Sequence, residues 1–203
     1  MKCPSCGTPQ AQPSVECKSC GLTLKSLDDR FGFVPRHRAS VTDLGQILSL
    51  KELKKVERCL KQFNRKYPGV AFAVVLTKLP PMRKPSEYCF WLINRGNFAD
   101  SEAKLGRNRT ILLLLDFEGP AASLMVGYGL ESIFSEDDLK HAVGTAVPFL
   151  KGDDLCGAAI ACVQAVDPIL CQRLVAMVES RGKSSVAGNG AVSALNSVSR
   201  VSS

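Results

Sequence analysis

The spacing of apolar residues predicts an amphipathic helix after residue 48. Ser49 fits the N-cap position, and Glu52 three residues later completes a capping box. The proline and glycine at 68–69 end the helix, since neither residue continues one well. The apolar residues at helical spacing are Leu50, Leu53, Val56, Leu60 and Phe63. One face of this helix is therefore expected to be buried.

Three further apolar stretches predict strands. Residues 70–78 are apolar and β-branched, and residues 110–117 are apolar on both faces, which favours a central strand in a covered sheet. A short turn separates the second strand from a third at 122–129, so these two are expected to be antiparallel neighbours. Between the first two strands, Ser86 is the predicted N-cap of a helix over about 87–94.

Helical signals return in the last third of the chain. Ser135 is a predicted N-cap with Asp138 at the N3 position. Residues 153–180 are apolar nearly all round and predict one or two packed helices. Small residues dominate 181–203, and this Gly/Ser/Ala/Val segment is expected to be a disordered tail.

These elements predict an α/β domain over 41–180. The order helix–strand–helix–strand–strand–helix–helix gives a βαβ step followed by a hairpin, hence a mixed β-sheet with helices on both faces. Two segments with a different texture precede it. Residues 1–24 are rich in cysteine, and residues 25–40 lack periodicity, so we expect a small separate unit and a linker.

Two copies of the motif Cys-x-x-Cys-Gly, at 3–7 and 17–21, predict a zinc ribbon. Two residues between paired cysteines let a tight turn aim both sulfur atoms at one metal ion. Gly7 and Gly21 can adopt positive φ, which turns backbone N–H groups toward the thiolates. A site with four protein ligands is closed, so the zinc would be structural. A pair of redox dithiols is the alternative, but redox chemistry does not require duplication. The predicted ligands are Cys3, Cys6, Cys17 and Cys20.

The ribbon resembles short zinc ribbons that bind nucleic acid, bind protein or brace a terminus. It has few basic residues and no aromatic residue before Phe31, so it has no stacking platform for bases. A protein contact or a brace is therefore favoured. The formal net charge of +7 over 203 residues is also far below that of a dedicated nucleic-acid binder.

The remaining composition predicts a cytoplasmic, soluble protein. The nine cysteines are odd in number, and five of them are scattered through apolar segments, as in a reducing compartment. The N-terminus has no apolar stretch of a secretory signal. No run of about 18 apolar residues is present, so no membrane span is expected.

The stretch Gly127-Tyr128-Gly129 raises the question of a nucleotide site. A dinucleotide fingerprint needs a third glycine at position 132, which is Ser132, and the strand belongs to a hairpin rather than to the start of a βαβ unit. No nucleophile stands at motif spacing from His37 or His141, so a hydrolase triad has no support.

Residues 41–170 resemble the TPM domain, a family of phosphatase-like proteins. The likeness rests on segments in the family's order. They are VTDLGQILS at 41–49, VAFAVVLTK at 70–78, CFWLINR at 89–95, NRTILLLL at 108–115, LMVGYGLE at 124–131 and FLKGDDLCGAAIACV at 149–163. The resemblance implies a divalent-metal site, often calcium, in an acidic cleft.

Hairpin topology locates this cleft. Gly127-Tyr128-Gly129 should lie beside residues 107–109, because the end of one hairpin strand adjoins the start of the other. Glu131 and the carboxylates of Asp137 and Asp138 follow nearby, and such oxygen ligands suit calcium. The candidate cleft or weakened calcium site comprises Asn108, Arg109, Tyr128, Glu131, Asp137 and Asp138.

One departure from the family pattern weakens the expected calcium site. The family has Asp-Asn-Gly or a close relative before the second strand, where this chain has Asn108, Arg109 and Thr110. The arginine could instead pair with Glu131 or Asp138, or receive a phosphate. A purely structural role for these residues is also open, because the two aspartates suit the first turn of a helix and the glycines suit close packing.

Two hypotheses about function follow. In the first, a zinc ribbon tethered to a TPM-like domain acts as a non-catalytic protein-interaction or adaptor module. In the second, the chain is a calcium-dependent phosphatase of the TPM type, as the resemblance implies. The departure at 108–110 and the lack of a convergent acid–base pair favour the first.

Overall fold

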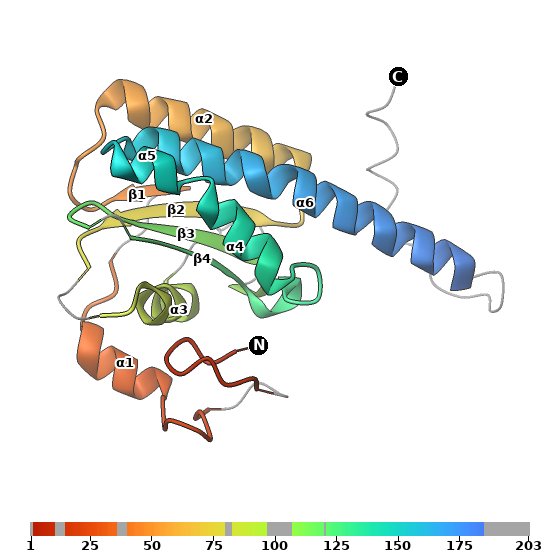
Figure 1. Cartoon of the computed structure of the whole chain (residues 1–203), viewed down its shortest axis with the longest axis horizontal. Helices are drawn as coiled ribbons and strands as arrows, with labels where there is room; N and C mark the ends of the chain where they lie inside the picture. Colours follow the sequence, from red (N-terminus) through yellow and green to blue (C-terminus); the bar gives the residue numbers. More distant parts are fainter. Residues whose placement is uncertain are drawn as a thin grey trace.

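A computed structural model describes residues 2–10, 15–35, 40–79, 83–96, 107–119 and 121–184 (Figure 1). Four strands and six α-helices, with two short 3-10 turns, make up this part of the chain. In chain order they are α1 (Leu24–Phe31), β1 (Val41–Asp43), α2 (Leu50–Lys66), β2 (Ala71–Thr77), α3 (Pro85–Arg95), η1 (Arg107–Arg109), β3 (Thr110–Asp116), β4 (Ala122–Val126), η2 (Tyr128–Leu130), α4 (Glu136–Gly144), α5 (Val147–Lys151) and α6 (Leu155–Ser184).

The strands form one mixed sheet in the order β1-β2-β3-β4. β1, β2 and β3 are parallel, whereas β3 and β4 are the antiparallel arms of the predicted hairpin. β3 is an inner strand, and Ile111 to Leu115 are wholly buried. The prediction of a central strand covered on both faces is therefore confirmed.

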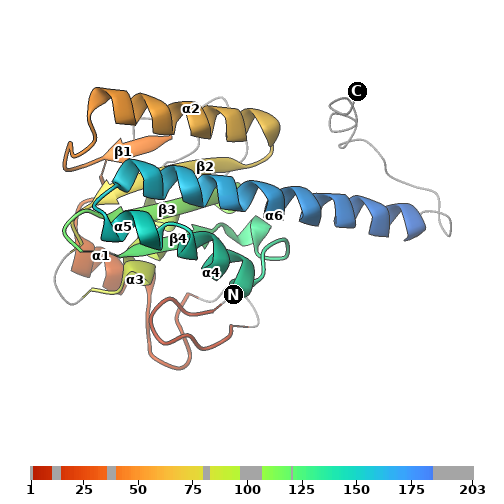
Figure 2. The ribbon, with the colours of Figure 1, turned by 45° about the horizontal axis from the view of Figure 1, so that its top comes forward.

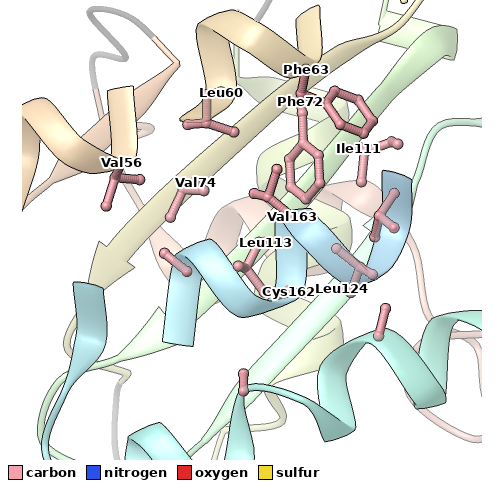
Figure 3. Packing of buried hydrophobic residues seen from close by; sticks show 14 of the residues in the cluster. Val56, Leu60, Phe63, Phe72, Val74, Ile111, Leu113, Leu124, Cys162 and Val163 are labelled. Carbon is pink, nitrogen blue, oxygen red and sulfur yellow. The ribbon is translucent and has the colours of Figure 1, made fainter. Parts of the chain in front are cut away.

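Helices cover both faces of this sheet, as predicted (Figures 1 and 2). On one face, α2, α4 and α6 pack on alternate strand residues such as Val74 and Leu113. Figure 3 shows this layer, where Phe63 of α2 meets Phe72 of β2 with ring centroids 5.1 Å apart. On the other face, α3 and α1 pack on the intervening residues, including Val75 and Leu112. The predicted α/β class is confirmed.

Local capping signals are confirmed at two helices and wrong at a third. Ser49 with Glu52, and Ser135 with Asp138, form capping boxes at the starts of α2 and α4. Ser86, the predicted N-cap of α3, lies inside that helix, which begins at Pro85 with no side-chain cap. Proline suits the first helical position because it has no N–H to leave unbonded. The Ser86 hydroxyl instead donates a hydrogen bond to the Pro4 carbonyl, at 2.7 Å.

Two elements differ from the prediction for residues 25–49. Strand β1 occupies Val41–Asp43, where the sequence pattern predicts no strand, because three residues are too short to show a strand period. Helix α1 lies within the segment expected to be an irregular linker. Leu27 is fully buried, and Leu24 and Phe31 at helical spacing pack on the same cluster. A capping box between Thr23 and Ser26 begins the helix. The proposed limits of the ribbon and the α/β domain stay predictions.

Side-chain contacts with α3 hold α1 in place. Phe31 packs edge-on against Tyr88 at 4.9 Å between ring centroids. Asp28 accepts a hydrogen bond from the Trp91 indole at 2.9 Å and pairs with Arg95 at 2.6 Å. These partners lie more than fifty residues further along the chain, so the packing of α1 on α3 is not a local feature of the sequence.

Helix α6 is one continuous helix that extends beyond the sheet (Figure 1). It runs to Ser184, three residues past the predicted start of the tail, and residues 185–203 lie outside the described part. By length and composition alone, Leu155–Glu179 could cross a membrane, and 44% of that apolar window is buried in the fold. A core helix passes the same test, so the expected absence of a membrane span stays a prediction.

Substitution of Asp28 should reveal how α1 is held. The Arg95 guanidinium, with help from Trp91, lowers the pKa of Asp28 in the folded state. A lowered folded pKa gives stability that is fully present above the unfolded value of about 3.9 and is lost as the pH falls through the folded value. We expect Asp28→Asn to lower the urea midpoint at pH 7, and the difference from the wild type to shrink toward pH 3.

Asp29→Asn is the matched control, because Asp29 is an exposed neighbour on the same helix. Its urea midpoint should follow that of the wild type across the same pH range. A difference between Asp28→Asn and the wild type that stays constant from pH 7 to pH 3 would contradict this account.

Candidate metal centre and the adjoining corner

The two Cys-x-x-Cys-Gly segments form a pair of matching knuckles. The Gly7 N–H donates to the Cys3 carbonyl at 2.9 Å, and the Gly21 N–H donates to the Cys17 carbonyl at 2.8 Å. Both glycines have positive φ, 75° and 71°, a conformation that residues with a side chain rarely adopt. The positive φ predicted for these glycines is confirmed, and their own N–H groups donate to carbonyl oxygens of the knuckles.

The four sulfur atoms converge on one point. Their ligand positions all lie within 4.8 Å of one another. Cys3 and Cys20 Sγ atoms are 3.6 Å apart, and those of Cys6 and Cys17 are 3.7 Å apart. A tetrahedron with metal–sulfur bonds of about 2.3 Å has sulfur–sulfur edges of about 3.8 Å. The cluster therefore has the dimensions of a four-thiolate metal site.

The electrostatics of the cluster also suit a cation. Hydrogen bonding with Thr8 lowers the pKa of the Cys6 thiol to about 6, which favours its thiolate form. Burial raises the pKa of Cys3. Several thiolates at this separation repel one another, which keeps some of the thiols protonated unless a positive ion lies between them. The donor set is thus compatible with a metal such as zinc.

The ribbon docks on the α/β domain at two places. Ser86 and the Lys84 ammonium group, at the start of α3, donate to the carbonyls of Pro4 and Ser5. Lys2 forms an ion pair with Glu136 in the first turn of α4. Figure 2 shows the ribbon lying beside α3. The ribbon therefore packs against the α/β domain.

The Gly-Tyr-Gly segment forms a tight corner against residues 107–110. The Gly127 N–H donates to the Thr110 carbonyl at 2.7 Å. A Cβ atom on Gly129 would lie 2.9 Å from the backbone oxygen of Asn108, closer than real contacts allow. The predicted neighbourhood is confirmed, and Gly129 serves the close approach of two backbones.

The candidate cleft residues point in different directions. Asp138 accepts from the Ser135 N–H at 2.9 Å and from Arg173 of α6 at 2.8 Å. Although desolvation opposes it, these bonds hold the pKa of Asp138 below its usual value. Asp137 is exposed. The guanidinium of Arg109 lies near Gly69, at the turn after α2, since a Cβ there would be 3.7 Å from Nη1.

Three candidate residues do share one hollow, of about 470 Å³. Asn108, Tyr128 and Glu131 line it together with side chains from the ribbon, α3, β4 and α4. The sequence gives no sign of the ribbon's contribution, because Lys2 and Glu136 are 134 residues apart. The further lining residues are Lys2, Pro9, Gln10, Phe90, Ile93, Asn94, Leu124, Met125, Val126, Gly127, Phe134, Glu136 and Leu139.

Comparison with known families identifies the α/β part. The TPM domain matches residues 41–169, which is more than half of the chain. The chain belongs to the TPM domain family. The resemblance predicted from the sequence is confirmed over nearly the same residues.

Solved structures share the fold of this TPM domain. The BA42 protein of the psychrophilic bacterium Bizionia argentinensis has 13% identity and a TM-score of 0.54, over 64% of this chain and 86% of that chain. The N-terminal domain of the cg2496 protein from Corynebacterium glutamicum has 16% identity and a TM-score of 0.50, over 64% and 78%. None of the curated proteins matches. At these identities the likeness concerns the fold alone.

Among the histidine, cysteine, aspartate and glutamate side chains in the described ranges, the four cysteines are the group of three or more whose ligand atoms converge. The carboxylates near the corner of this TPM domain do not form such a group there. The centre of metal-ligand chemistry in the described part is the ribbon.

Gly129→Ala should destabilise the TPM domain. The new methyl group would press on the Asn108 carbonyl, and such overpacking costs about 1–3 kcal/mol. Gly144→Ala is the matched control, because no atom lies within 4 Å of its added Cβ in helix α4. The control should be neutral or gain about 0.5–1 kcal/mol from helix propensity. Urea unfolding measures both, and equal midpoints would argue against the close approach.

Proposed function

We propose that this protein is a non-catalytic interaction module, in which a zinc-held ribbon and a TPM domain together bind another protein. The proposal rests on a difference between the two candidate centres, the cysteine cluster and the Gly-Tyr-Gly corner. The cysteines converge at metal-site distances, whereas Asp138 is engaged by its helix cap and by Arg173. The cysteines of the ribbon are thus arranged to hold a metal ion, whereas the residues of the corner make structural contacts.

Zinc is the metal that the cysteine cluster fits best. Tetrahedral sites of four thiolates take zinc or iron, and four protein ligands leave no open position for substrate or water. Such an ion is structural. A reducing, cytoplasmic compartment is part of this proposal, because five of the nine cysteines are scattered through apolar segments.

The corner supports binding more readily than phosphate chemistry. A calcium site gathers several oxygen ligands around one point. In this chain an amide and a guanidinium stand where the family has Asp-Asn, and Arg109 extends toward Gly69. What remains around the hollow is a lining of both apolar and polar side chains, a combination found in binding sites.

The alternative, a calcium-dependent phosphatase, is tested directly. We expect the zinc-loaded full chain to show no calcium binding by titration calorimetry. Hydrolysis of p-nitrophenyl phosphate should not exceed that of the Glu131→Gln variant, with or without calcium. Turnover that disappears both on calcium chelation and in Glu131→Gln would overturn the non-catalytic proposal.

Zinc content is tested separately. The purified chain should contain one zinc ion, and the Cys6→Ser, Cys20→Ser double variant should contain none, as measured by mass spectrometry of metals. Zinc should also leave as the pH falls, because protons compete for the thiolates.

Cys59→Ser is the control for this measurement, since Cys59 lies on α2 outside the cluster and should keep the zinc. Zinc retained by the double variant would show that the metal binds elsewhere. A wild-type chain purified without zinc and unable to bind it would reject the zinc assignment.

A further inference from the structure

Strand β4 is an outer strand of the sheet, and its edge faces the hollow. Among the described residues, the sheet order leaves one side of β4 without a neighbouring strand. Leu124, Met125 and Val126 are consecutive, and all three line the hollow. Side chains of successive strand residues point to opposite faces, so what the three residues share toward the hollow is the backbone edge.

The pairing with β3 fixes which backbone groups point outward. The Asp116 N–H donates to the Ala121 carbonyl, and the Gly127 N–H donates to the Thr110 carbonyl. In an antiparallel ladder these hydrogen-bonded pairs alternate, so Ser123 and Met125 also bond to β3. The N–H and C=O groups of Leu124 and Val126 therefore point away from β3. Within the described residues, no backbone partner meets them.

The surroundings of this edge suit a single extended chain. Helices α3 and α4 flank β4 on the two faces of the sheet, and the ribbon borders the same hollow (Figures 1 and 2). A folded second sheet would meet these helices before it reached the edge, whereas one extended strand needs only about 4.8 Å beside β4. Apolar side chains of Phe90, Phe134 and Leu139 offer contacts for alternate residues of such a chain.

The charges around the hollow are balanced. Glu131 and Glu136 contribute two carboxylates, and Glu136 pairs with Lys2 and, at 2.9 Å, with Lys140. Apolar contacts, rather than a charge, are therefore expected to select the partner.

We propose that the hollow binds an extended peptide segment of a partner protein, which adds to the β4 edge as a fifth strand and carries alternate apolar residues. This inference rests on the proposed interaction function and names its site and its class of partner. Backbone hydrogen bonds at Leu124 and Val126 provide the affinity, and the pockets on either side select the side chains. Since Lys2, Pro9 and Gln10 line the hollow, an intact ribbon is part of the site.

The test begins with a phage-displayed library of random decapeptides selected on the zinc-loaded full chain. Selection is repeated on the Leu124→Pro variant, which removes one outward N–H without touching the ladder to β3. Circular dichroism and urea unfolding establish that the variant folds. We expect peptides enriched in alternating apolar residues, and at least a tenfold weaker Kd for the variant by fluorescence anisotropy.

Two readouts keep the test independent of that variant. A synthetic copy of a selected peptide should slow amide exchange at Leu124 and Val126, while Ser123 and Met125 change little because they already bond to β3. N-methylation of the peptide backbone should abolish binding when it is placed on the alternate residues whose N–H groups face β4. The same modification on the intervening residues should leave binding intact. Side-chain contacts alone would not produce this alternation.

The outcomes separate the inference from the function on which it rests. No selected peptide, or peptides that bind without protecting Leu124 and Val126, would overturn β-strand addition while leaving an interaction function through another surface. Calcium-dependent turnover in the phosphatase assay would instead overturn the function itself. Binding with alternating protection, weakened in Leu124→Pro, would establish the site.

Discussion

Burial of both faces of strand β3 is the constraint on which the fold depends. Ile111 to Leu115 have no exposed surface, so each face of the sheet needs its own layer of helices. The two hydrophobic clusters follow directly, one with α2, α4 and α6 and one with α3 and α1. The same strand also pairs in parallel with β2 and antiparallel with β4, and thereby brings its own start beside the end of β4.

That juxtaposition creates the corner and defines what the corner can do. Asn108 and Gly129 approach so closely that the backbones touch, which leaves little room for a ligand between them. The polar groups of the corner instead turn outward, some toward the hollow and others toward α6 or the end of α2. Family membership therefore describes the scaffold, whereas the chemistry of this chain depends on where its own side chains point.

The ribbon completes the surface that the TPM domain leaves open. Its carbonyl groups are held by Lys84 and Ser86, and its Lys2 is held by Glu136. These contacts place the cysteine cluster, the hollow and the β4 edge in one neighbourhood. A metal that orders a short ribbon can in this way shape a binding surface without taking part in any reaction.

The sequence by itself determined the features that depend on neighbouring residues. The knuckles, the capping boxes at Ser49 and Ser135, the apolar central strand and the hairpin are local in the chain, so spacing and residue type were sufficient to predict them. The packing of helix α1 on α3, the partner of Asp138 and the docking of the ribbon depended on residues tens to more than a hundred positions away. Only the tertiary structure decided these, because the free energy of each contact comes from groups that folding brings together.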